Sequence, residues 1–263
     1  MTGYPREAPG PFRAHQIRDG DHYELHEGHA IHCMTAGERH AKANLAGGRV
    51  LATDPEVAGA AGVDAGFSFN GEANLRAPDI STGVGDGPGW MRSAPPLAVE
   101  YAGKGQDEAE LQAKIKELLA AGTRYLWVVR LTGRLRVEVH KAGEPMQVVE
   151  AEGVLSAPGV LRNPVPVRAL VDGKAANAAT LRNLLNAEGY ESLEDLRAKS
   201  HAEGQKQGEM QARAQAIETV LRARGLMIED RLLTRLQSCR DPVLLGRWLV
   251  QSATAATAEA ALD

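Results

Sequence analysis

The sequence of 263 residues lacks several features that mark specialised classes of protein. Its two cysteines, Cys33 and Cys239, lie far apart and provide no disulfide framework, so reduced thiols and a cytoplasmic location are expected. No apolar run approaches the roughly 18 residues of a membrane span, so no membrane partner is expected. The first eleven residues are rich in proline and glycine and lack the apolar core of a signal peptide.

The chain also lacks a strong net charge. The formal charge is -4, so no overall basic field attracts nucleic acid. Binding to nucleic acid would therefore require a local basic patch, or a metal ion that offsets carboxylates. What remains is ordinary for a globular protein of one or two domains: 43% of residues are hydrophobic and 24% are charged.

Short apolar runs alternate with helical patterns after a segment, residues 1–20, that we expect to be a flexible tail. Asn70-Gly71 between two apolar runs is a strong signal for a tight hairpin. A helix is expected over 107–121, ended by Gly122, and strands are expected over 97–101 and 125–131. The order and spacing of these strands and helices predict an α/β (α+β) domain over 21–189, with a mixed β-sheet flanked by helices.

The composition changes near Gly189, and residues 190–263 read as a helical, coiled-coil-like C-terminal region. Ser192 can cap a long helix. Apolar residues then recur at coiled-coil-like spacing, at Met210, Ala214, Ile217 and Leu221. This stripe has no obvious partner in the first domain, so we expect a homodimer through these helices. The segment after Ser252 is mostly alanine and is expected to fray.

Two carboxylates and one lysine form the main chemical pattern of the chain. Asp79 follows Pro78 at the end of one strand-like run, and Glu100 ends the next. Lys114 lies in the helix that follows. If the two strands are neighbours, the carboxylates can hold a divalent cation at one sheet edge, and the lysine can stabilise charge on a phosphate. The alternative is a turn residue, a strand-end charge and a surface lysine.

The same stretch, from about Tyr23 to Trp127, resembles the Uma-two family of restriction-endonuclease-like nucleases, a branch of the PD-(D/E)XK superfamily. The matching pieces in order are Tyr23-Glu24-Leu25-His26-Glu27-Gly28, His40, Arg76-Ala77-Pro78-Asp79-Ile80-Ser81, Pro96-Leu97-Ala98-Val99-Glu100, Lys114 and Tyr125-Leu126-Trp127-Val128-Val129. The resemblance implies a restriction-endonuclease-like fold. It also implies that Asp79 and Glu100 bind the metal and that Lys114 is the third catalytic group.

The chain departs from the superfamily pattern at one important position. The usual lysine two residues after the acid is replaced by Ala102, so Lys104 competes with Lys114 for the catalytic role. Glu24 or Glu27 is a candidate extra metal ligand, with a plain strand-end charge as the alternative. An all-oxygen ligand set suits Mg2+, and Mn2+ can substitute for it.

Other residues suggest contacts with nucleic acid. Arg130, Arg134 and Arg136 lie on one predicted hairpin and could touch a phosphate backbone, although a solvated hairpin is the simpler explanation. Trp90, in a glycine-rich loop, could stack on a base or could anchor the loop. The loop lacks the Gly-Lys-Ser/Thr ending of a phosphate-binding loop, which excludes a nucleotide site of that kind. The clustered histidines match no zinc motif.

The leading hypothesis is a Mg2+-dependent endonuclease that hydrolyses DNA. A second hypothesis is a catalytically inactive protein that keeps the nuclease fold and acts in binding or assembly through its C-terminal helices, which the net charge and Ala102 favour. A third is a toxin- or transposon-associated regulator whose helical region carries the function. Metal binding separates the first two hypotheses, and truncation near Gly189 tests the third.

Overall fold

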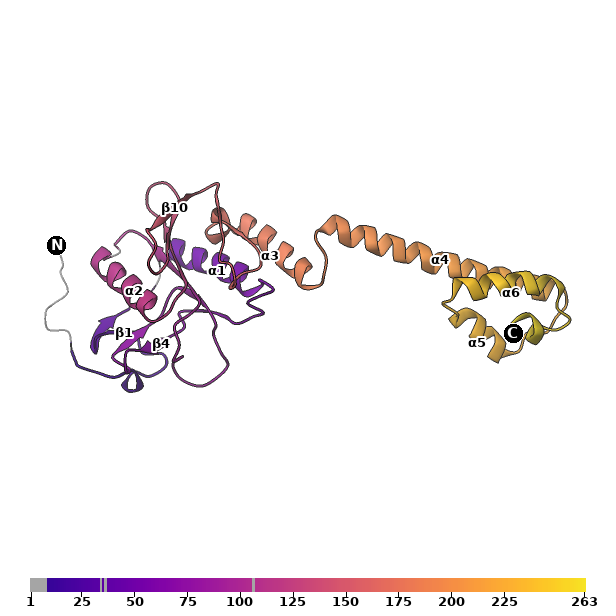
Figure 1. Ribbon diagram of the computed structural model, residues 1–263, viewed down its shortest axis with the longest axis horizontal. Helices are drawn as coiled ribbons and strands as arrows, with labels where there is room; N and C mark the ends of the chain where they lie inside the picture. The colour runs from indigo at the N-terminus through magenta and orange to yellow at the C-terminus, as the bar shows by residue number, and fades with distance from the viewer. Residues whose placement is uncertain (1–8, 34, 36, 106) are drawn as a thin grey trace. The chain divides into compact units, whose positions relative to one another are not determined.

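The computed structural model describes residues 9–33, 35, 37–105 and 107–263. The chain divides into two compact units, Met1–Gly189 and Tyr190–Asp263. The first contains both large sheets and the helices around them, and the second is entirely helical in its regular structure (Figure 1). The two units are described separately below.

The first unit is built on a mixed six-stranded sheet in the order β10-β9-β8-β7-β6-β3. Its strands are β3 (Ala61–Val63), β6 (Ile80–Thr82), β7 (Leu97–Ala102), β8 (Tyr125–Arg130), β9 (Arg136–His140) and β10 (Gln147–Glu150). β7 and β8 are parallel, and the other neighbours are antiparallel. Helix α2 (Glu108–Ala120) connects the parallel pair, because parallel strands need a crossover.

A smaller sheet has the order β2-β1-β5-β4, formed by β1 (Tyr23–His26), β2 (His29–His32), β4 (Phe67–Phe69) and β5 (Asn74–Arg76). The hairpin expected at Asn70-Gly71 is present, but four residues, 70–73, connect its strands rather than two. Asn70, Gly71 and Glu72 all have positive φ, which asparagine and glycine tolerate best. A pair of two-residue strands, β11 (Val154–Leu155) and β12 (Val165–Pro166), completes the unit's sheets.

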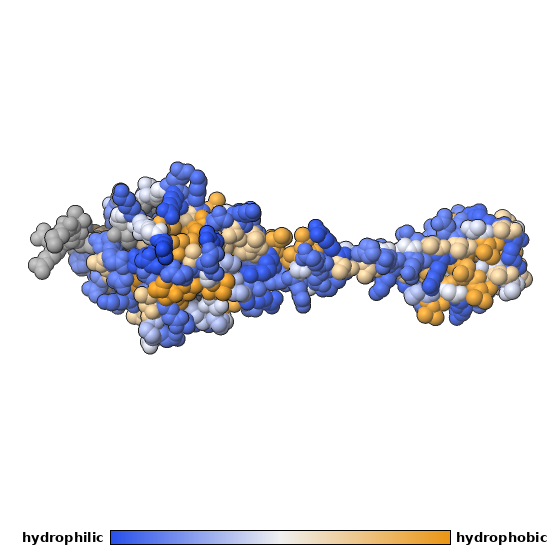
Figure 2. Space-filling view, turned by 90° about the horizontal axis from the view of Figure 1, so that it is seen from above, coloured by the Kyte–Doolittle hydropathy of each residue, from blue (hydrophilic) through white to orange (hydrophobic). Residues whose placement is uncertain are grey.

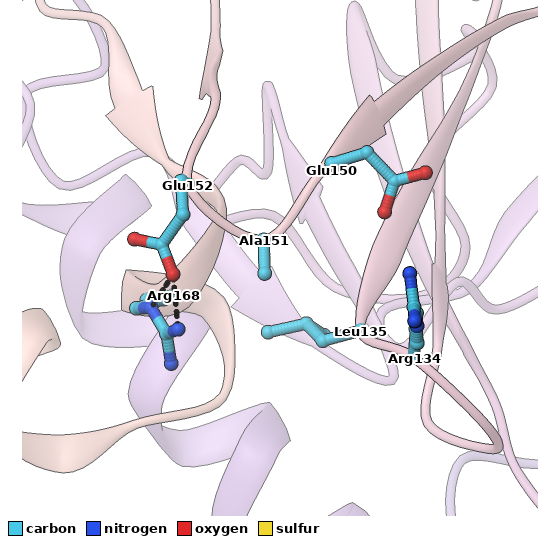
Figure 3. Close-up of a pocket in the computed structure, with 6 residues that line it drawn as sticks. All are labelled: Arg134, Leu135, Glu150, Ala151, Glu152 and Arg168. Atoms are coloured by element: carbon cyan, nitrogen blue, oxygen red, sulfur yellow. Dashed lines mark hydrogen bonds and ion pairs between the residues drawn. The ribbon is translucent and has the colours of Figure 1, made fainter.

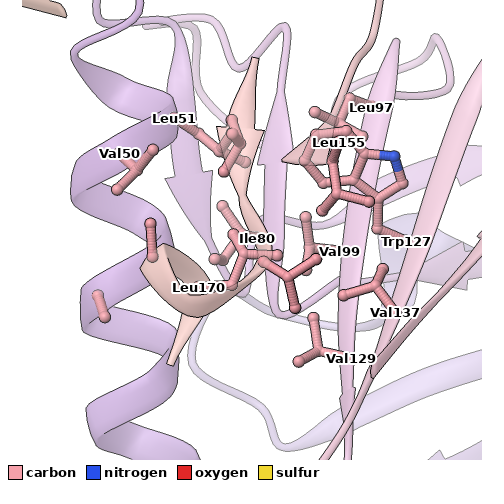
Figure 4. Close-up of a cluster of buried hydrophobic side chains, with 14 of the residues drawn as sticks. Val50, Leu51, Ile80, Leu97, Val99, Trp127, Val129, Val137, Leu155 and Leu170 are labelled. Carbon is pink, nitrogen blue, oxygen red and sulfur yellow. The ribbon is translucent and has the colours of Figure 1, made fainter. Parts of the chain in front are cut away.

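Side chains of β7 point alternately to two cores, as the period of a strand requires. Leu97, Val99 and Tyr101 join the larger core, which packs against α1 (Glu38–Ala52), α3 (Gly173–Ala187) and the 3-10 helix Val167–Leu170 (Figure 4). Ala98 and Ala102 face the other way, into a smaller core with Leu111, Ile115 and Leu118 of α2. Position 100 therefore lies on the α2 side of the sheet.

The N-terminal segment contacts the rest of this unit from Pro9 onward, where Pro9 O accepts from Ala30 N at 3.1 Å. A 3-10 helix, Ala14–Gln16, buries Ala14, and the indole Nε1 of Trp90 donates to Ala14 O at 2.9 Å. Residues 12–17 of the segment expected to be flexible thus contact the body, while 1–8 lie outside the described residues. Trp90 thus anchors its loop to the body, as one of the two alternatives expected, and stacking on a base stays a prediction.

The second unit consists of α4 (Leu193–Ala223), α5 (Asp230–Ser238), α6 (Pro242–Thr254) and α7 (Ala258–Ala261). The stripe Ala214, Ile217 and Leu221 is buried against α5 and α6, and Met210 packs beside it. The expectation that a second copy covers this stripe is wrong, because the unit's own helices cover it. The alanine-rich end does not fray either, since Ala258, Ala261 and Leu262 are buried in the same core.

Helix boundaries in this unit follow from capping residues. Ser192 accepts a hydrogen bond from Asp195 N at the start of α4, and Asp241 caps α6 with Pro242 in its first turn. Residues 197–209 of α4 are exposed all round, and this part of the helix is mostly hydrophilic in Figure 2. Among the described residues, no helix is long and apolar enough to cross a membrane.

Candidate active site

Strand pairing brings the two predicted carboxylates together. Asp79 does not end a strand, as the sequence suggested, but directly precedes β6. Because β6 runs antiparallel to β7 with Ile80 opposite Val99, the next pair of positions is Asp79 and Glu100. The start of one strand thus meets the end of its neighbour, and both acids lie at one edge of the sheet.

Lys114 reaches Glu100 from α2. It occupies the helix face that also carries Leu111, Ile115 and Leu118, so its stem is buried between helix and sheet. Three oxygens surround its ammonium: Glu100 Oε1 at 2.8 Å, Ala77 O at 2.8 Å and Glu24 Oε1 at 2.9 Å. An ammonium has three N–H groups, so each has an acceptor within reach.

Glu24, from β1, is held by three donors. Its Oε1 accepts from Lys114 and from Ala77 N at 3.1 Å, and its Oε2 accepts from Arg76 Nη1 at 3.0 Å. Arg76 is completely buried and also binds Glu117 with Nε at 2.7 Å and Nη2 at 3.2 Å. Glu24, Asp79, Glu100 and Lys114 thus form one cluster, in which Glu24 lies between two cations, Arg76 and Lys114.

Asp79 is oriented by two different partners. Its Oδ2 accepts from the backbone N–H of Tyr101 at 2.6 Å, and its Oδ1 lies 2.7 Å from His40 Nε2 on α1. The hydroxyl of Tyr101 donates to Leu170 O at 2.8 Å, which fixes this part of β7 in the large core. Two lone-pair directions of Asp79 are thereby used, and its side chain keeps 16% exposure.

The electrostatics of the cluster are dominated by burial and by an excess of acids. Burial raises the pKa of Glu100 to about 8, opposed by Lys114 and reinforced by Asp79 and Glu24. Burial also opposes the charge of Lys114, but Glu100, Glu24 and Asp79 raise the pKa of this ammonium. The hydrogen bond to Asp79 raises the pKa of His40. Although burial works against it, the two nearby cations lower the pKa of Glu24.

The donor set of Asp79 and Glu100 fits a hard divalent cation. Glu100 Oε1 is buried and, apart from its ion pair with Lys114, accepts no hydrogen bond of good geometry from the described residues. Within those residues no group of three His, Cys, Asp or Glu is arranged to hold a metal ion. Mg2+ commonly uses only one or two carboxylates, with waters and substrate phosphates completing its octahedron.

Two other predicted site residues lie outside the cluster. Glu27 is an exposed turn residue with positive φ between β1 and β2, and makes no contact with the cluster among the described residues. Lys104 is exposed in the turn after β7, where the described residues give it no ion pair. Of the two candidate lysines, Lys114 is the one that contacts the acids.

The arginines predicted to touch nucleic acid divide into two kinds. Arg130 binds Glu108 and Glu138 with hydrogen bonds of 2.7–2.9 Å, and Arg136 lies 3.6 Å from Glu138, so both charges are compensated. Arg134 lines an open pocket, opposite an ion pair of Glu152 with Arg168 (Figure 3). Glu150 lines the same pocket, and of the three arginines Arg134 is the one for which the described residues give no ion pair.

Sequence reasoning missed the supporting residues: His40, Arg76, Glu117 and the backbone N–H of Tyr101. The burial of Arg76, which requires acidic partners, is seen only in the structure, because its three-residue strand shows no period in the sequence. His40 and Asp79 are separated by 39 positions, and no local pattern links them.

Comparison with known proteins identifies the family and the fold of the first unit. The model of the family described as "Putative restriction endonuclease" (Uma2) matches residues 11–165. A crystal structure described as a putative nuclease belonging to DUF820 from Anabaena variabilis is 16% identical and has a TM-score of 0.52. The match covers 61% of this chain and 94% of that one, and shows that the two share a fold.

A search of curated protein sequences gives no match. The family match includes Glu24, Asp79, Glu100 and Lys114, and it spans more than half of the chain. The first unit has the mixed α+β architecture of the Anabaena protein. The family match and this shared fold together identify the family of the chain. The chain belongs to the Uma2 family of putative restriction endonucleases.

Proposed function

We propose that this protein is a Mg2+-dependent endonuclease that hydrolyses phosphodiester bonds of DNA, with Mn2+ able to replace Mg2+. The observation that supports it most directly is the convergence of Asp79, Glu100 and Lys114, with the ammonium 2.8 Å from Glu100. Two adjacent carboxylates can hold a metal ion for phosphodiester cleavage, and a lysine beside them can stabilise negative charge on the phosphate.

Asp79 and Glu100 would hold the cation, which when bound polarises the phosphate and acidifies a water. Tyr101 N–H and His40 orient Asp79 toward that position. Lys114, which contacts Glu100 directly, would stabilise the negative charge that develops on the phosphate. The apolar neighbours on β7 and α2 keep bulk water from the lysine stem, which strengthens these interactions.

Contact with DNA would come from the surface near the site, and Arg134 is the predicted arginine whose charge stays open to a phosphate. A homodimer would let two sites cut two strands. That state remains a prediction, and it needs a surface other than the buried stripe of α4. A cytoplasmic location also remains a prediction.

The second candidate is a catalytically inactive protein of the same fold. One observation of the structure favours it: each N–H group of Lys114 already has an oxygen within 3 Å. In addition, Ala102 stands where the superfamily has a lysine, so no second cation is supplied there. On this alternative the cluster is a structural ion network, and the helical unit carries the function.

Cleavage assays separate the two candidates. Plasmid, linear and single-stranded DNA would be incubated with Mg2+ or Mn2+ and with wild type, Asp79→Ala, Glu100→Ala or Lys114→Met. We expect cutting to fall by more than about 100-fold in each variant, since ligands matter more than outer-shell groups. Glu144→Ala, which removes an exposed acid paired with Lys141, is the matched control and should cut like wild type.

Cutting that survives in Asp79→Ala or Glu100→Ala would show that the cluster is not the active site. If no substrate is cut and calorimetry detects no Mn2+ binding to the wild-type protein, the nuclease proposal fails. The inactive, assembly-type function would then take its place.

A further inference from the structure

A fully buried arginine lies one side chain away from Lys114 and has no part in the proposed chemistry. The Arg76 side chain is 0% exposed and makes three hydrogen bonds in a fork: two to Glu117 and one to Glu24. A planar guanidinium binds carboxylates in fixed directions, whereas a lysine acts as a point charge. The direction of the Arg76 Nη1–H bond therefore decides where the Glu24 carboxylate lies.

Glu24 passes this orientation on to Lys114. One oxygen is taken by Arg76, and the other receives both Ala77 N–H and the ammonium. Three of its roughly four lone-pair directions are thus used, all by donors within 3.1 Å. A carboxylate held in this way is a counterion with a fixed geometry and has little capacity left for a metal ion.

The backbone next to Arg76 completes the cradle of the lysine. Ala77 donates its N–H to Glu24 and gives its carbonyl oxygen to Lys114, at 3.1 and 2.8 Å. Two of the three acceptors around the ammonium are therefore set by residues 76–77 and by the carboxylate that Arg76 holds. The third acceptor, Glu100, is one of the two acids assigned to the cation.

We infer that Arg76 and Glu24 form a positioning pair that holds the ammonium of Lys114 beside Glu100, and that Glu24 is not a metal ligand. The inference rests on the proposed function only in taking Lys114 as the group whose position matters. Glu117 supports the pair from the other side, because it binds Arg76 through both oxygens. The predicted role of Glu24 as an extra ligand is replaced by a role toward the lysine.

The first experiment needs neither metal nor substrate. Nuclear magnetic resonance of the 15N-labelled, metal-free full chain detects lysine ammonium groups whose protons exchange slowly because they are buried and hydrogen-bonded. Loss of one signal in Lys114→Arg assigns it. We expect that signal to disappear in Glu24→Gln, whose amide cannot accept at both ends, and in Arg76→Lys, which lacks the fork.

Arg130→Lys is the matched control, since Arg130 also binds two carboxylates but does not touch Lys114, and should keep the signal. Circular dichroism establishes that each variant is folded. If Arg76→Lys does not fold, Glu24→Gln alone decides. An unchanged Lys114 signal in a folded Glu24→Gln protein would overturn the inference, as would the absence of any such signal in wild type.

Calorimetry with Mn2+ tests the second half of the inference. We expect Glu24→Gln to weaken Mn2+ binding by no more than about 10-fold, the lower end of an outer-shell effect, and Glu100→Gln to weaken it by more than about 100-fold. A loss of that size in Glu24→Gln would make Glu24 a ligand and overturn the inference. If wild type binds no Mn2+ at all, the proposed function fails, and the lysine signal still decides whether Arg76 and Glu24 position Lys114.

Discussion

Two arginines of the first unit make similar contacts in different surroundings. Arg76 is fully buried and binds Glu117 and Glu24, while Arg130 keeps 14% exposure and binds Glu108 and Glu138. Glu24 is shared with Lys114, whereas neither carboxylate around Arg130 contacts a lysine among the described residues. Ion pairing alone does not distinguish the two clusters, but burial and the shared carboxylate do.

The difference shows how a fold can use one kind of contact for two purposes. The Arg130 cluster ties the start of α2 to β8 and β9, and one of its acids, Glu108, is 56% exposed. The Arg76 cluster also meets α2, at Glu110 and Glu117, and its Glu24 contacts Lys114 of the proposed active site. The first cluster fixes a helix end, and the second holds the lysine of the proposed site.

The largest expected effect comes from removing each arginine in turn. Arg76→Met leaves Glu24 and Glu117 partly uncompensated in the interior and should lower the free energy of unfolding by about 3–5 kcal/mol. Arg130→Met removes charge-assisted hydrogen bonds nearer the surface and should cost about 1.5–3 kcal/mol. Urea denaturation of the metal-free variants measures both, and equal losses would abolish the distinction between the clusters.

A smaller effect concerns the packing behind the active-site cluster. A Cβ at Gly47 of α1 would lie 2.2 Å from the Tyr101 hydroxyl oxygen, so Gly47→Ala should cost about 1–3 kcal/mol by overpacking. Gly48→Ala is the matched control: its nearest contact is 3.4 Å, and alanine should stabilise this helix by about 0.5–1 kcal/mol. Thermal unfolding of both variants tests this, and a stabilised Gly47→Ala protein would contradict it.

A further contrast between the two clusters concerns pH dependence. The folded pKa of Glu100, about 8, lies above its ordinary value of 4.5, so the folded state retains a proton that the unfolded chain loses. Stability should therefore fall as pH rises between these values, by at most about 1.4 kcal/mol per unit. Arg130 instead lowers the pKa of Glu108 to about 2, so its contribution is lost as pH falls below 4.5, and solvent screening keeps it small.

Unfolding in urea at a series of pH values measures this contrast. Glu100→Gln should flatten the fall in stability between pH 5 and 8, because the titrating group is gone. Glu108→Gln should leave that range unchanged and alter only the acidic side. A Glu100→Gln protein whose stability follows wild type across pH 5–8 would show that Glu100 is ionised there in the folded state.

Much of the fold could be predicted because long elements carry clear patterns. The helix with Leu111, Ile115 and Leu118 follows from periodicity and from Gly122 as its end, and apolar runs predict the two strands beside it. Strands of three residues, such as Asn74–Arg76 and Ile80–Thr82, are too short to show a period. This is why Asp79 was expected at a strand end although it precedes one.

The site could be predicted in its main residues but not in its contacts. The order of Asp79, Glu100 and Lys114 indicated a catalytic group, but no sequence pattern shows that Glu24 would meet Arg76 52 positions later. The same limit applies to Arg130, whose partners Glu108 and Glu138 come from a helix and from another strand. Partners so distant in sequence are decided by sheet pairing.

The two hydrogen bonds of Tyr101 have a consequence for biosynthesis. Its backbone N–H holds Asp79, while its hydroxyl depends on Leu170, which lies 69 positions later and beyond the end of the family match at residue 165. A nascent chain emerging from the ribosome would carry Glu24, Asp79, Glu100 and Lys114 before it carries this last support. The hydrogen bond from Tyr101 to Leu170, which supports the proposed catalytic edge, can therefore form only after the ribosome has passed residue 170.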